Sequence, residues 1–76
     1  MQVNWIHLPA EFDADKAIAL VVYGKDAGIK IPAKEQVEAQ TIRKRLHEAA
    51  LRQIVPIRIS ILGMPPMMEV HVEKYQ

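Results

Sequence analysis

Apolar and polar residues alternate at both ends of the chain. Residues 2–8, QVNWIHL, alternate over a segment rich in β-branched and aromatic side chains that ends before Pro9, which predicts a strand. Residues 55–75 contain two alternating runs on either side of Gly63-Met64-Pro65-Pro66-Met67, a pattern typical of a β-hairpin. Each run has one apolar and one polar face, as in a sheet with one side exposed to water.

The middle of the chain has helical spacing. Between residues 32 and 54, one helical stripe collects Ala39, Ile42, Leu46, Ala49 and Ala50. Pro32 suits the first position of a helix, and Pro56 prevents its continuation. The spacing therefore predicts a helix over residues 32–54.

Residues 12–28, FDADKAIALVVYGKDAG, fit two structures. Asp13 is a favourable N-cap and Gly28 a favourable residue just past a helix end, which together indicate a helix over residues 13–27. The run AIALVVY is apolar on every side and rich in β-branched residues, which is also typical of a buried strand. We favour the helix and keep the strand as the alternative.

These elements give the order β-α-α-β-β within a single small domain, residues 1–76. The sequence thus predicts the α+β class, with a three-stranded antiparallel sheet and two helices on one face. The same order also fits a winged-helix-like fold in which the hairpin is the wing.

The composition narrows the class of protein. Half of the 76 residues are hydrophobic and a quarter are charged, which is typical of a folded domain. The chain has no Cys, so a disulfide framework and a thiolate metal site are excluded. No apolar run is long enough to cross a bilayer and the N-terminus lacks a signal-peptide pattern, so we expect a cytoplasmic location.

The net charge of +1 is unevenly distributed. Residues 1–31 carry three bases and four acids, residues 32–54 five bases and three acids, and residues 55–76 two of each. The excess positive charge therefore lies on the predicted helix 32–54. The polar face of this helix carries Gln40, Thr41, Lys44 and Arg45, and Arg43 and Arg52 flank it.

These six side chains suit contact with nucleic acid. Amide and hydroxyl groups hydrogen-bond base edges, while lysine and arginine bind phosphate or guanine. We therefore predict a small regulatory protein that binds duplex DNA through this face. Glu48 lies on the same face and can pair with Lys44 or Arg52, so the alternative is an ordinary charged surface on a core helix.

Residues 41–51, TIRKRLHEAAL, resemble the second helix of the helix-turn-helix in mariner-type transposases, and the resemblance extends over residues 37–56. Upstream, Ala27-Gly28-Ile29 resembles the turn after the preceding helix of that family. The resemblance implies DNA binding by a protein of mobile-element or phage type. Residues 32–39 are longer than the family's turn, and no transposase catalytic domain fits in 76 residues.

The predicted hairpin loop suggests a different partner. Met64, Pro65, Pro66, Met67 and Met68 form an apolar cluster, and Met-rich surfaces adapt to protein partners. The alternative function is therefore a protein-interaction module, such as an inhibitor or accessory subunit, that docks through this loop or a sheet edge. Pairing across sheet edges would also form a homodimer. The other interpretation of the methionines is that they fold back onto the core.

We predict that the chain is not an enzyme and needs no cofactor or metal. His7, His47 and His71 are far apart in the sequence, without the spacing of metal ligands. Ser60 does not lie in a nucleophile motif. The three glycines are too widely spaced to form a phosphate-binding loop.

Overall fold

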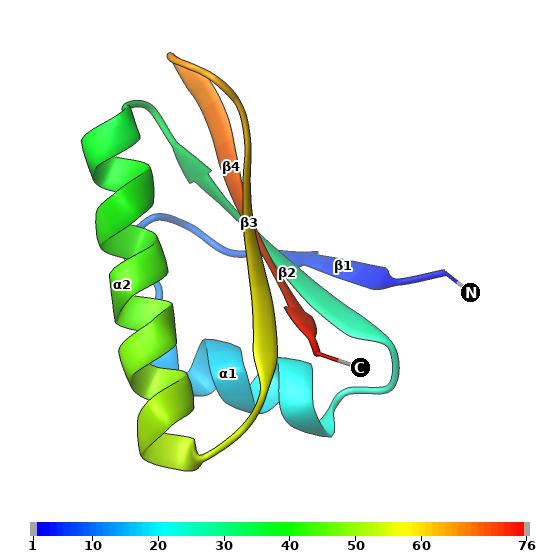
Figure 1. Cartoon of the computed structure of the whole chain (residues 1–76). Coiled ribbons are helices and arrows are strands. Elements are labelled where there is room, and N and C mark those ends of the chain that lie inside the picture. The colour runs from blue at the N-terminus through cyan, green and yellow to red at the C-terminus, as the bar shows by residue number, and fades with distance from the viewer. Residues whose placement is uncertain (1, 76) are drawn as a thin grey trace.

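The structure, a computed structural model, describes residues 2–75 (Figure 1). Its elements in chain order are β1 (Asn4–His7), α1 (Ala14–Tyr23), β2 (Ala27–Ala33), α2 (Gln36–Gln53), β3 (Ile57–Met64) and β4 (Met67–Lys74). The strands form one mixed sheet in the order β1-β2-β4-β3. β1 is parallel to β2, and the other neighbours are antiparallel.

The α+β class and the two helices are confirmed, but the predicted three-stranded antiparallel sheet is wrong. The prediction omits β2, because it assigns Ala27 to the first helix, assigns Pro32 and Ala33 to the second, and assigns residues 28–31 to no element. Ala27, Gly28 and Ile29 lie in this strand rather than in a turn. The two helices are therefore connected through a sheet strand.

Pro32 lies in β2, not at the start of a helix. A proline interrupts a sheet because it lacks the backbone N–H. The Lys30 carbonyl points toward β1, where it accepts a hydrogen bond from the backbone N–H of Leu8. Because alternate residues of a strand direct their backbone groups to the same side, the backbone nitrogen of Pro32 also points toward β1. β1 has already ended there, and its last pair is His7 with Lys30. The proline therefore costs the sheet no hydrogen bond.

The first helix is confirmed, but it is shorter than predicted. The Asp13 carboxylate accepts a hydrogen bond from the backbone N–H of Lys16 at 3.2 Å, which caps the helix as expected. The helix ends at Gly24 rather than near Gly28. Gly28 lies beneath the indole of Trp5, where a Cβ atom would come within 2.7 Å of a ring carbon. Its lack of a side chain lets Trp5 pack against β2.

The second helix and the hairpin are also confirmed, but the helix is shorter than the predicted 32–54 and the hairpin turn is tighter than predicted. α2 begins at Gln36, and all five residues of its apolar stripe are buried. In the hairpin, Met64 and Met67 are strand residues, so only Pro65 and Pro66 remain in the turn.

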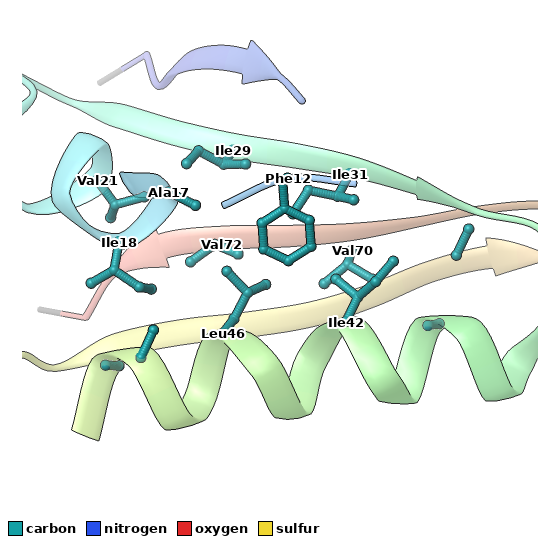
Figure 2. Packing of buried hydrophobic residues seen from close by; sticks show 14 of the residues in the cluster. Phe12, Ala17, Ile18, Val21, Ile29, Ile31, Ile42, Leu46, Val70 and Val72 are labelled. Carbon is teal, nitrogen blue, oxygen red and sulfur yellow. The ribbon is translucent and has the colours of Figure 1, made fainter. Parts of the chain in front are cut away.

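The hydrophobic core lies between the two helices and one face of the sheet (Figure 2). Alternate residues of the two central strands point toward the helices, and Leu46 of α2 is completely buried against them. The largest fully buried side chains are Ile18, Val21, Ile29, Ile31, Leu46, Val70 and Val72. None of the helices within residues 2–75 is long and apolar enough to cross a lipid bilayer.

Candidate interaction surface along α2 and β3

The predicted nucleic-acid residues are divided between two flanks of α2. Gln40, Arg43 and Lys44 line a groove between α2 and β3. Arg45 and Arg52 line a depression on the opposite flank, which faces α1. The residues that sequence spacing placed on one basic face are therefore not a single site.

The flank that faces α1 uses its cations within the fold. The guanidinium of Arg45 donates a hydrogen bond to the Phe12 carbonyl at 2.8 Å and lies 4.5 Å from the centroid of the Phe12 ring. Arg52 forms an ion pair with Asp15 at 3.0 Å. Hydrogen bonding by Arg52 holds the pKa of the Asp15 carboxyl below its usual value. These two arginines therefore connect α2 to the segment around α1.

The acids on this flank reduce its positive charge further. Its depression is lined by Glu11, Asp13, Ala14, Asp15, Arg45, Glu48 and Arg52. Four carboxylates thus face two guanidinium groups. Because negative charge is in excess, this surface does not attract a polyanion.

The opposite flank has a different composition. The β3 groove, as we name it, is lined by Gln40, Arg43, Lys44, His47, Ile57 and Ile59, and has a volume of about 610 Å³. No carboxylate lines it. Within residues 2–75, neither Arg43 nor Lys44 forms an ion pair. The groove therefore combines an isoleucine floor with unneutralised cations.

Thr41 lies between the two flanks and is exposed. Its hydroxyl donates a hydrogen bond to the Val37 carbonyl of the preceding turn at 3.0 Å. The hydroxyl proton is thus occupied within the helix, as is common for threonine in helices.

β3 forms one edge of the sheet and presents unpaired backbone groups to the groove. Tyr75 donates a backbone hydrogen bond to the Pro56 carbonyl at 3.3 Å, and hydrogen-bonded pairs alternate along an antiparallel ladder. In the observed register, Arg58, Ser60 and Leu62 therefore bond to β4. The backbone groups of the intervening isoleucines, Ile57, Ile59 and Ile61, point out of the sheet.

The hairpin tip is only partly as predicted. Met64 and Met67 have 79% and 82% of their surface exposed, and Pro65 and Pro66 are also exposed. Met68 is not available to a partner, because it is buried in the core with 4% of its surface exposed. Met68 therefore folds back onto the core, while Met64 and Met67 remain exposed at the hairpin tip.

The sheet face opposite the helices carries a small polar and aromatic cluster. The rings of Trp5 and His71 have centroids 4.9 Å apart, and the Lys30 ammonium lies 5.0 Å from the Trp5 ring. His71 also lies 3.0 Å from the Glu69 carboxylate, and this hydrogen bond lowers the pKa of Glu69. Throughout residues 2–75, no three histidine or carboxylate side chains converge as a metal site would require.

The sequence identified three residues of the β3 groove and missed the others. From the sequence, His47 is considered only as a metal ligand, and Ile57 and Ile59 have the pattern of ordinary core-facing strand residues. Their alternation predicts the strand, but no local pattern shows that the strand lies at an edge of the sheet beside α2.

The comparisons with known proteins give no relative for this chain. No protein-family model matches it, and neither a curated protein nor a solved structure does.

Proposed function

We propose that this chain is a protein-interaction module whose β3 edge accepts an extended segment of a partner protein. The observation that carries the proposal is the row of outward-pointing backbone groups at Ile57, Ile59 and Ile61. An added strand would satisfy these donors and acceptors, as in other complexes formed by strand addition.

The β3 groove supports this proposal because it offers three kinds of contact to one strand. The edge supplies main-chain hydrogen bonds, Ile57 and Ile59 supply apolar surface, and α2 supplies polar side chains above them. β3 also contains neither lysine nor proline, two residues that commonly protect an edge against pairing. A partner strand that followed β3 to its end would reach the exposed Met64 at the hairpin tip.

Duplex DNA is the second candidate partner, because Gln40, Arg43 and Lys44 remain exposed on one flank of a surface helix. Phosphate contacts supply much of the affinity for DNA, and here Arg45 and Arg52 are engaged with Phe12 and Asp15. The isoleucine floor contributes nothing to phosphate binding, and the strand edge presents carbonyl acceptors beside each N–H donor, so it has no preference for an anion. The geometry thus favours a polypeptide.

The strand-addition proposal is tested by removing one outward N–H. Ile59→Pro deletes that donor without deleting a hydrogen bond to β4, while Ile59→Ala loses the same side chain and keeps the N–H. Random decapeptides displayed on phage are selected on the wild-type protein, and the selected peptides are then titrated against both variants. Both variants lose the apolar contact of the isoleucine, so we expect Ile59→Pro to bind about tenfold or more weakly than Ile59→Ala, which is about 1.4 kcal/mol.

Two results would contradict the proposal. Ile59→Pro could bind the selected peptides as tightly as Ile59→Ala does, or the display selection could yield no peptide. A duplex DNA of about 20 base pairs, titrated at two salt concentrations, tests the second candidate. DNA would be favoured over a polypeptide if DNA binding fell steeply with salt and were lost in Lys44→Glu. The same binding should then survive in both Lys25→Glu and Ile59→Pro. Circular dichroism and urea unfolding establish that each variant is folded.

A further inference from the structure

The charge of the β3 groove specifies the kind of segment that fits it. Arg43 and Lys44 stand above the edge of β3, and the carboxylates of α2 are directed elsewhere. Glu48 lines the depression facing α1, and Glu38 lines a separate cavity beside the hairpin. An added strand would therefore meet positive charge on its helix-facing side.

The spacing of these side chains matches the period of a strand. In a strand, every second residue points to the same face, and such residues are roughly 6.6 Å apart. Residues one turn apart in a helix, such as Gln40 and Lys44 or Arg43 and His47, are roughly 6 Å apart along its axis. α2 and β3 run side by side in opposite directions (Figure 1). Alternate residues of an added strand can thus each lie near a polar side chain of α2.

We infer that the partner of the β3 edge is an acidic extended segment, with Asp or Glu at alternate positions that face α2. This inference rests on the strand-addition function proposed above. The acid level with Arg43 and Lys44 would pair with these two cations, and the acids on either side of it would lie near Gln40 and His47. The backbone of the segment would bond to Ile57, Ile59 and Ile61. The residues between the acids would point to the opposite face of the sheet, beside Arg58, Ser60 and Leu62.

A second copy of this chain is a poor occupant of the same edge. Antiparallel pairing of two β3 edges by a twofold axis would place both copies of α2 on the same face of the extended sheet. The two cationic flanks, each with Arg43 and Lys44, would then face one another without an intervening carboxylate. Repulsion between like charges therefore disfavours a homodimer through β3.

Three peptides of about ten residues test the inference. They share valine and threonine at one set of alternate positions and carry only glutamate, glutamine or lysine at the other set. Each is labelled with a fluorophore and titrated against the wild-type chain by anisotropy. We expect the glutamate peptide to bind about tenfold more tightly than the glutamine peptide, and the lysine peptide to bind most weakly.

The double variant Arg43→Glu/Lys44→Glu should reverse this order and favour the lysine peptide. Lys16→Glu/Lys25→Glu makes the same change in net charge away from the groove, and should preserve the order. Urea unfolding checks that both double variants remain folded. Because reversal requires the charged side chains to face the peptide, a general loss of structure cannot produce it.

The outcomes separate this inference from the function on which it rests. If all three peptides bind the wild-type chain equally and Ile59→Pro loses this binding, strand addition is supported but the inference of an acidic partner is overturned. If none of the three binds and display selection also yields no peptide, strand addition itself fails. A concentration-dependent dimer that Ile59→Pro abolishes in sedimentation would identify a second copy as the occupant and overturn the inference.

Discussion

The two flanks of α2 carry similar side chains with different uses. On the flank facing α1, Arg45 and Arg52 bond to Phe12 and Asp15 and so hold the helix to its neighbours. On the flank facing β3, Arg43 and Lys44 form no ion pair with any residue between 2 and 75. Adjacent residues in the sequence, such as Lys44 and Arg45, can therefore have separate roles, because a helix turns them in different directions.

The largest expected difference between the flanks is in stability. Arg45→Ala removes a hydrogen bond to the Phe12 carbonyl and a cation–π contact, so we expect the free energy of unfolding to fall by about 1–2 kcal/mol. Arg43→Ala removes an exposed side chain without such contacts and should change it by less than about 0.5 kcal/mol. Urea denaturation of both variants measures the difference. Equal losses of stability would mean that the contacts of Arg45 with Phe12 contribute no more to the fold than the exposed side chain of Arg43.

A smaller difference is expected at acid pH. The pKa of Asp15 is lowered in the folded state by its hydrogen bond from Arg52, so the pair contributes stability above the unfolded-state pKa. This contribution is lost as pH falls through the folded-state pKa. Asp15→Asn should therefore show a slightly shallower fall in urea midpoint than wild type between about pH 6 and about pH 3.

The acid titration has an internal control. Glu69, whose pKa is also lowered, is present in both proteins, and its hydrogen bond with His71 lies on the other face of the sheet. Its contribution therefore cancels in the comparison. Parallel curves for wild type and Asp15→Asn would show that the exposed pair with Arg52 adds nothing to stability.

The smallest expected effect concerns binding. Asp15→Ala releases Arg52 and raises the net charge by one, but the released cation lies on the flank away from β3. We expect the affinity for the glutamate peptide to change by less than about twofold. Fluorescence anisotropy at physiological salt measures it. A gain as large as tenfold would show that the peptide contacts the α1 side instead.

Local periodicity was enough to predict α2, the hairpin and the capping of α1. It was not enough for β2, because Ile29 and Ile31 give only a short alternation and Pro32 resembles a helix start. The proline is accommodated only because β1 stops before it, which is a tertiary property. The same limit applies to the β3 groove, since the position of β3 at the sheet edge depends on where β2 and β4 lie.

The pairing of β2 with β4 also has a consequence for the order of folding. These strands are neighbours in the sheet, but the whole of α2 and β3 lies between them in the chain. Closing so long a loop is slow compared with forming a hairpin. In refolding from urea, the core-facing side of β2 is therefore completed only when Val70 and Val72 of β4 pair with it. Protection of β2 from proteolysis should arise together with this pairing, after the hairpin has formed.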